Sequence, residues 1–288
     1  MTTTQARREP DPAASLGDSG SGGIVIRRVE TQEDYDECVR IQIETWGAGF
    51  SERVPSTILR LSQYLGGVTA AAFSPEDGRM LGFVFGMTGV REGRLVHWSD
   101  LLAVRPEARG RGIGRRLKLF QRAAVLPLGV TRMSWTFDPL VAKNAHLNLN
   151  TLGARVTEYV PDMYGVNTGS ALHFAVGTDR FIVAWDLTTE PSPAPRRPGI
   201  AGPPSTALVV NRIDSPGQAA AVHSGVDAGD VYVAVPEDIH EVMATRLDLA
   251  RAWRESTRAA FLRYLKRGYR VSGFHRGDGH GFYHLVRE

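Results

Sequence analysis

The sequence predicts an α/β protein with a smaller α+β part at its C-terminal end, and three observations lead to this prediction. Short apolar runs alternate with helical patterns from residue 24 to residue 187. A glycine-rich turn joins the apolar run 95–104 to the helical pattern 113–125. Six of the sixteen prolines fall between Pro191 and Pro204, which marks a semi-rigid linker before a last group of strands and one long helix.

Composition limits the class of protein. A chain of 288 residues suits one large domain or two modest ones. The single cysteine, Cys38, excludes an internal disulfide framework and fits a reducing compartment, so we expect a cytoplasmic protein. The longest apolar runs, such as 80–85, are too short to span a bilayer, and no charged-then-apolar leader opens the chain. We therefore expect no membrane partner and no secretion.

Four segments follow from the distribution of turn-forming and apolar residues. Residues 1–22 are rich in Asp, Ser, Gly and Thr without periodicity and are expected to form a disordered tail. The main domain covers 23–190, the proline-rich linker 191–206, and the C-terminal α+β domain 207–288.

The elements of the main domain follow from periodicity and turn signals. Thr31 is a good N-cap for a helix that runs to about residue 45, where Gly47 ends it. The turn at 75–78 joins two strands. Gly153 ends the helix that follows the strand 133–137. The expected strands are 24–28, 68–73, 80–90, 95–104, 133–137, 156–160 and 181–187, and the further helices are 56–64, 113–125 and 142–152.

Helix 113–125 has one apolar stripe, which we expect to be buried. The stripe consists of Ile113, Leu117, Phe120 and Ala124. The opposite, polar face is expected to hold Arg115, Arg116, Lys118 and Arg122.

The C-terminal domain reads as a ββαββ arrangement. Its expected strands are 207–212, 230–235, 269–275 and 282–287, with a helix at 247–267. Three of its histidines, at 275, 280 and 284, and Asp278 resemble a metal-ligand set only superficially. We interpret them as polar positions on a hairpin and expect no metal.

The segment 104–118 carries the most chemical information. Its Gly110, Gly112 and Gly114 allow positive φ angles and close approach of a ligand to the backbone. The following helix presents unpaired N–H groups and the positive end of its dipole, which together form a diphosphate site. Seven basic residues lie between 105 and 122 against one acid, which favours a polyanionic ligand over an ordinary strand-to-helix turn. The spacing fits neither the Rossmann fingerprint nor a P-loop.

These residues resemble a known family. The run 109–114, Arg-Gly-Arg-Gly-Ile-Gly, preceded by 101–104 and Pro106, is similar to the Arg/Gln-x-x-Gly-x-Gly/Ala motif of the GNAT superfamily of N-acetyltransferases. The likeness covers about a third of the chain and looks like one bacterial branch in which some members acylate amino acids. It continues through 134–140, 144–148, 152–154, 164–165 and 178–180.

The resemblance implies the GNAT fold, a mixed central sheet flanked by helices, and acetyl-CoA or another acyl-CoA as co-substrate, with no metal. In this light the C-terminal domain is interpreted as a degenerate half-copy of the same fold. The residues implied to contact coenzyme A are Leu102, Ala103, Val104, Arg109, Gly110, Arg111, Gly112, Ile113, Gly114 and Arg115. We add Asn144 and Asn148, four apart on one helix face, as partners of the pantetheine amides, with local packing as the alternative.

Acyl transfer to an amine needs a base for the ammonium proton and an acid for the leaving thiolate. Asp100 is the candidate base because it is a carboxylate inside an apolar strand, although the resembling sequences tend to have histidine there. A paired structural carboxylate is the alternative. His97, on the other face of the strand, is a second candidate.

The family's acid is a helix tyrosine, and Leu149 stands at its position here. Tyr164 is our candidate substitute and Tyr159 the alternative, because a phenol with a pKa near 10 suits protonation of a thiolate. Asp179 and Arg180 are interpreted as structural residues at a strand start, and the alternative is that Arg180 pairs with a carboxylate of the acyl group or acceptor.

The acceptor pocket is assigned to Glu44, Trp46 and Trp98, with core packing and a solvated acid as the alternative. The sequence thus predicts an N-acyltransferase that moves an acetyl or succinyl group to a small primary amine, such as an amino acid, in a ternary complex. The rival hypothesis is a non-catalytic CoA-binding regulatory or scaffold module. Nucleic-acid binding is disfavoured because the basic stretch has no interleaved aromatics, and a homodimer is left open.

Overall fold

The computed structural model describes residues 23–165, 168–170, 172, 176–190, 202–212, 221–222, 228–277 and 279–287. The predicted tail 1–22 and residues 191–201 of the predicted linker lie outside this range. The chain divides into two compact units, Met1–Thr45 with Arg53–Met133 and Trp46–Glu52 with Ser134–Glu288. The predicted domain boundary at 191–206 stays a prediction.

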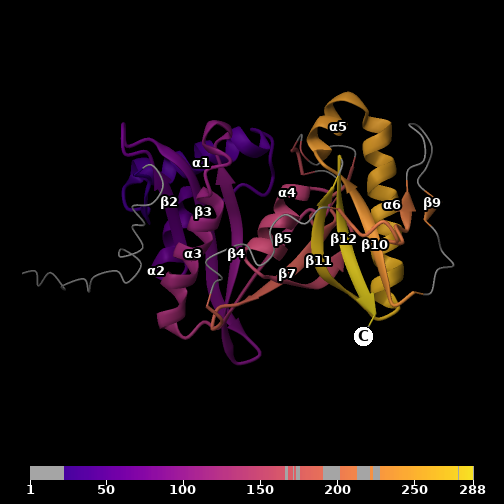
Figure 1. Ribbon diagram of the computed structural model, residues 1–288. Helices are drawn as coiled ribbons and strands as arrows, with labels where there is room; N and C mark the ends of the chain where they lie inside the picture. The colour runs from indigo at the N-terminus through magenta and orange to yellow at the C-terminus, as the bar shows by residue number, and fades with distance from the viewer. Residues whose placement is uncertain are drawn as a thin grey trace, which may run out of the picture. The chain divides into compact units, whose positions relative to one another are not determined.

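The fold class is α/β, as expected. Seven strands form a large mixed sheet in the order β1-β2-β3-β4-β5-β7-β6, and a smaller three-stranded sheet has the order β10-β12-β11 (Figure 1). A two-stranded ribbon, β8-β9, completes the described sheets.

The first unit contains four antiparallel strands and three helices. Most of its predicted elements agree with the structure to within one or two residues. Thr31 caps the first helix as predicted, because its Oγ1 accepts a hydrogen bond from the Asp34 amide at 3.1 Å. The elements are β1 (Val25–Arg28), α1 (Gln32–Trp46), α2 (Ser56–Tyr64), β2 (Val68–Phe73), β3 (Met80–Arg91), β4 (Arg94–Val104), a short 3-10 turn (Pro106–Ala108), α3 (Ile113–Val125) and a second 3-10 turn (Leu126–Leu128).

A tight hairpin and a β-bulge shape the β3–β4 pair. Glu92 and Gly93 at the hairpin tip have φ angles of 53° and 72°, as a type I′ turn requires. Farther along, Phe85 pairs with Leu101 but Gly86 pairs with Ser99, so the β4 residue between them is the extra one. That extra residue is Asp100. A bulge re-aims the side chain at which it occurs.

Helix α3 packs on strands β1 to β4 through the predicted apolar stripe. One prediction about this helix is wrong. Lys118, expected on the polar face, is buried with 3% of its surface exposed, and the neighbouring Gln121 is buried as well. The buried side of α3 is therefore wider than the apolar stripe.

The second unit contains the elements β5 (Arg132–Phe137), α4 (Ala142–Ala145), a π-helix (His146–Thr151), β6 (Arg155–Val160), β7 (Arg180–Asp186), β8 (Asn211–Arg212), β9 (Ala221–Val222), β10 (Asp230–Pro236), α5 (Ile239–Thr245), α6 (Leu247–Lys266), β11 (Tyr269–Gly277) and β12 (His280–Arg287). Four differ from expectation. The strand predicted at 207–212 shrinks to two residues, and the helix predicted at 142–152 is α-helical and then π-helical. Strand β9 and helix α5 were not predicted.

One aromatic cluster forms the core of the second unit. The ring of Phe181 on β7 lies 4.7 Å from that of Phe261 on α6 and 5.4 Å from that of Tyr283 on β12. The Tyr283 hydroxyl donates to the carbonyl of Pro139 at 2.8 Å. The strands β5 to β7 and the C-terminal elements therefore share a single core, with α6 packed along the three-stranded sheet (Figure 1).

Among the described residues, no helix is both long enough and apolar enough to cross a membrane.

Candidate functional site

The glycine loop has the backbone conformation that the sequence predicts at two of its three glycines. Gly110 and Gly112 adopt φ angles of 76° and 73°. Gly114 lies inside the first turn of α3 and has no positive φ, so the conformation expected there is not found, whereas its contact with coenzyme A stays a prediction. Gly112 is the N-cap of α3, no side chain caps the helix, and its first turn contains no acid. The N-terminus of α3 thus keeps the features of an anion site.

The basic residues around the loop separate into exposed and buried ones. Arg109 and Arg111 are exposed, and the Arg109 Nε donates to the Val104 carbonyl at 3.1 Å. Arg105 is buried and forms ion pairs with Glu37 at 2.6 Å and Glu44 at 3.1 Å. The cations that face solvent at this loop are consistent with a polyanionic ligand.

Strand β4 presents the candidate base outward. Exposure alternates along the strand as predicted, with Asp100 exposed, Trp98 half-buried, and Ser99 and His97 buried. Asp100 is also the extra residue of the bulge. Bulges are over-represented next to active sites, so this position suits a reactive carboxylate.

His97 is poorly suited to act as a base. Its Nδ1 lies 2.9 Å from the Thr88 Oγ1, and because that hydroxyl donates to the Gly66 carbonyl, we assign the proton to Nδ1. Burial, together with the charge of Lys118, lowers the pKa of His97 to about 3. Of the two sequence candidates on β4, these observations favour Asp100.

Lys118 of α3 donates a hydrogen bond to Ser99 of β4. The Lys118 Nζ lies 2.7 Å from the Ser99 Oγ, and burial lowers the pKa of the lysine well below its usual value. Both side chains are buried between α3 and the sheet, each with 3% of its surface exposed. A substrate cannot reach them there, so we interpret the pair as structural.

The buried lysine gives a testable dependence of stability on pH. The unfolded chain holds the Lys118 proton at any pH below about 10.5, whereas the folded chain releases it at a lower pH. Between these two pKa values the unfolded state binds more protons. The free energy of unfolding should therefore fall by about 1.4 kcal/mol for each unit by which the pH is lowered. We expect Lys118→Met to remove this slope in urea unfolding measured at several pH values.

Two variants serve as controls for this prediction. Lys143 on α4 is exposed, so Lys143→Met should leave the slope unchanged. The change at 118 also leaves the buried Ser99 hydroxyl without its donor, at a cost of about 1 kcal/mol, which Ser99→Ala in the same chain should relieve. If the slope persists in Lys118→Met, then the lysine is charged in the folded protein.

The two helix asparagines do not share an environment. Asn148 is buried, and its Oδ1 accepts a hydrogen bond from the Trp135 Nε1 at 3.1 Å. Asn144 is half-buried on α4, two residues before the backbone changes to a π-helix. That the two asparagines share a face stays a prediction. Their contact with pantetheine stays a prediction.

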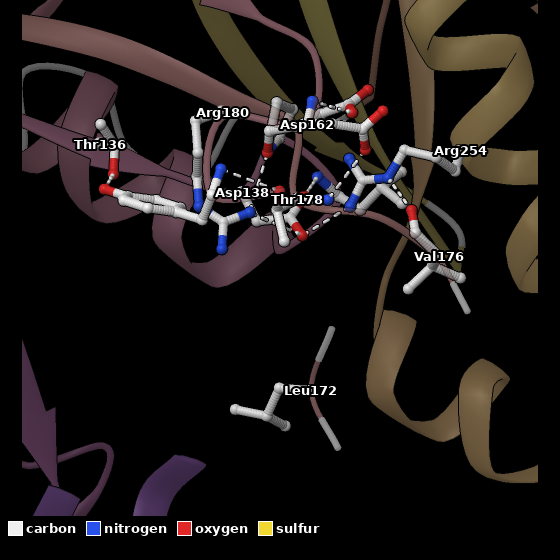
Figure 2. Close-up of polar contacts among 12 residues, drawn as sticks. Thr136, Asp138, Asp162, Leu172, Val176, Thr178, Arg180 and Arg254 are labelled. Atoms are coloured by element: carbon white, nitrogen blue, oxygen red, sulfur yellow. Dashed lines mark hydrogen bonds and ion pairs between the residues drawn. The ribbon is translucent and has the colours of Figure 1, made fainter. Parts of the chain in front are cut away.

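The two candidate tyrosines differ sharply. Tyr164 is half-buried, its hydroxyl lies 2.9 Å from the Thr136 Oγ1, and the guanidinium of Arg180 lies 5.3 Å from its ring centre (Figure 2). Tyr159 is buried, and its hydroxyl donates to Asp179. Burial and this carboxylate raise the pKa of Tyr159, which makes it a worse proton donor. Tyr164 is therefore the better candidate acid.

The predicted acceptor residues belong to different units. Glu44 is exposed and paired with Arg105 in the first unit. Trp46 belongs to the second unit, where its ring stacks on Phe50 at 5.5 Å. Trp98 lies on β4. The pocket composed of these residues stays a prediction.

The C-terminal histidines occupy the hairpin positions that the sequence indicates. His284 stacks on Tyr232 at 4.6 Å and hydrogen-bonds Asp230, whereas His275 packs edge-on against the same ring. Asp278 lies outside the described residues. Among the described residues, no three His, Cys, Asp or Glu side chains gather as metal ligands would.

A network of arginines in the second unit was not predicted from the sequence. Asp138, at the end of β5, is bonded by Arg254 of α6 at 2.6 Å and paired with Arg180 of β7 at 3.6 Å (Figure 2). Burial alone would raise the pKa of Asp138. The two cations lower this pKa by more than burial raises it, so the carboxyl stays ionised. The signal in the sequence was a pair of arginines four residues apart, at 254 and 258, on the predicted helix.

Neither the protein-family models nor the curated proteins include a match to this chain. Solved structures do show similarity. A GNAT-superfamily phosphinothricin acetyltransferase from Sinorhizobium meliloti, in complex with acetyl-CoA, is 18% identical, with a TM-score of 0.47 over 59% of this chain and 94% of that one. An N-acetyltransferase from Staphylococcus aureus is 15% identical, with a TM-score of 0.44 over 57% and 98%. The NatC complex bound to Gag peptide and CoA gives 18% identity and a TM-score of 0.44 over 57% and 98%.

Proposed function

We propose that this chain is an N-acyltransferase of the GNAT type. It transfers an acetyl group, or another short acyl group such as succinyl, from acyl-CoA to a small primary amine such as an amino acid. The observation that carries the proposal is the pair of left-handed glycines, Gly110 and Gly112, directly before the N-terminus of α3. Their place within the Arg-Gly-Arg-Gly-Ile-Gly motif supports a diphosphate ligand.

The loop fits coenzyme A on the evidence of its own backbone. A Cβ built on Gly110 or on Gly112 meets no atom within 4 Å, so the two positive φ angles are not explained by packing. They leave open space at the helix N-terminus, where a diphosphate can approach the amides. Arg109, Arg111 and Arg115 would add positive charge, and bound acyl-CoA would supply the activated thioester. The end of β4, at 102–104, would line the pantetheine.

The proton transfers fall to the two candidates that the structure favours. Asp100 would accept the proton of the attacking ammonium, since its carboxylate is exposed at the bulge of β4. Tyr164 would donate a proton to the leaving thiolate. No covalent acyl-enzyme is needed. Burial raises the pKa of the Cys38 thiol, which makes this residue a poor nucleophile.

The direct test is CoA binding with a matched pair of glycine variants. Gly112→Val should weaken CoA binding by about 10- to 100-fold in isothermal titration, because the side chain enters the space that the diphosphate would fill. Gly129, after α3, also has a positive φ, 87°, and open space around its Cβ position. Gly129→Val therefore introduces the same backbone strain away from the loop and should leave the affinity unchanged.

Three outcomes would reject or alter the proposal. No binding of CoA or acetyl-CoA at millimolar concentration rejects it. Tight CoA binding without thiol release, with amino acids, polyamines and a peptide N-terminus as acceptors, favours the non-catalytic CoA-binding module. Equal loss of affinity in both glycine variants shows that the effect is on stability rather than on the site.

A further inference from the structure

Two arginines of α6 bind the chain on either side of the candidate acid Tyr164. The Arg254 Nε donates to the Val176 carbonyl at 2.7 Å, and its Nη2 donates to the Asp138 carboxylate at 2.6 Å (Figure 2). One turn later, the Arg258 Nη2 donates to the Asp162 Oδ1 at 2.8 Å. Arg258 also forms a two-pronged pair with Asp179. Fork-shaped pairs of this kind fix direction as well as distance.

Within the segment that these arginines hold, backbone amides donate hydrogen bonds to side-chain oxygens. The Asp162 amide donates to Asp179 at 3.1 Å, and the Thr178 amide donates to Asp162 at 3.3 Å. The Tyr164 amide donates to the Thr178 Oγ1 at 3.1 Å. The turn around Tyr164 and the strand start at β7 are thus joined through the same two carboxylates that Arg258 binds.

The backbone at Asp162 shows that this arrangement is held under strain. Its φ angle is 44°, one of two positive φ angles among the described residues other than glycine. Such a conformation persists only where its surroundings impose it. The Asp162 carboxylate meets Arg258 and the Thr178 amide, so the arginine is part of what imposes it.

The contacts also reach the phenol itself. Arg254 bonds Asp138, Asp138 pairs with Arg180, and the Arg180 guanidinium lies over the Tyr164 ring. Arg254 and Asp138 are largely shielded from solvent, with side-chain exposures of 5% and 15%. Loss of Arg254 would leave Asp138 with Arg180 as its ion-pair partner, and loss of Asp138 would leave the buried Arg254 without its carboxylate.

We propose that Arg254 and Arg258 are positioning residues, through which α6 holds Tyr164 in the orientation needed to protonate the leaving thiolate. This inference rests on the proposed function. It gives the C-terminal elements a part in holding the candidate acid, through the turn at 162–165. The alternative is that the two arginines only stabilise the fold.

The test compares Arg258→Gln with a control variant, Arg263→Gln. Arg263 is an exposed arginine on the same helix. Arg258 is one-third exposed, so its variant should fold. Hydrogen exchange followed by mass spectrometry should show exchange at least about 10-fold faster in the peptides covering 161–165 and 176–180 for Arg258→Gln alone. In the acyl-transfer assay, kcat should fall by about 10- to 100-fold with unchanged affinity for CoA. Arg258→Lys should restore part of kcat.

The outcomes separate this inference from the proposed function. Unchanged exchange in Arg258→Gln overturns the inference. Faster exchange with unchanged kcat overturns it too, because the arginine is then structural only. Wild-type protein that transfers no acyl group refutes the proposed function and the catalytic part of this inference, whereas exchange still decides whether α6 holds the turn. Arg254→Gln, with Arg254→Lys as its conservative partner, repeats the comparison through Asp138.

Discussion

Replacing Asp100 by asparagine is expected to lower kcat for acyl transfer by about 10²- to 10⁴-fold, the usual contribution of a general base. Asparagine keeps the size of the side chain and cannot accept a proton. The residue is exposed at the bulge of β4, so the fold and the affinity for CoA should change little. Thiol release monitored with saturating amine, and titration with CoA, measure the two quantities separately.

A neighbouring acid provides the control for this test. Glu92→Gln, at the exposed tip of the same hairpin, should leave kcat unchanged. A variant at 100 that keeps the wild-type rate would assign the carboxylate to structure alone.

Replacing Gly86 by alanine is expected to destabilise the protein by about 3 kcal/mol or more, the range seen for overpacked cores with little room to adjust. A Cβ at this position would lie 2.4 Å from the His97 Nε2, 2.6 Å from the Gln121 Nε2 and 2.7 Å from the Trp98 carbonyl oxygen. One of these atoms is backbone and the other two belong to buried side chains. Urea unfolding followed by circular dichroism measures the loss.

A glycine three residues away provides the control. Gly89 lies on the same strand, and a Cβ there meets no atom within 4 Å, so Gly89→Ala should be close to neutral. Removing the Gln121 amide in a Gly86→Ala/Gln121→Ala protein should recover part of the loss, because one of the three close contacts disappears. Equal stability of the variants at 86 and 89 would show that the sheet can move to accept the methyl group.

Local patterns were sufficient to predict most of the elements around the loop. The N-cap at Thr31, the helix 113–125 and the positive φ angles of Gly110 and Gly112 all depend on neighbours within a few residues, and all are confirmed. The burial of Lys118 could not be predicted in this way. Its environment is set by Ser99, which is 19 residues away in sequence, on another element.

The arginine network was hidden for the same reason. Arg254 and Asp138 are 116 residues apart, and no local rule relates a helix arginine to a carboxylate at the end of a distant strand. Helix α5 is a different case, because its signal was present. Asp238 accepts bonds from the amides of His240 and Glu241, and an aspartate three residues before a glutamate is a capping pattern.

The rings of Phe181, Phe261 and Tyr283 meet face to edge inside one core, although β7 and the C-terminal elements are separated by the proline-rich stretch. A chain that ended after β7 would leave Phe181 without the rings of Phe261 and Tyr283 and would expose apolar surface there. Such a shortened chain would need a polar or otherwise shielded residue at position 181 to remain well folded.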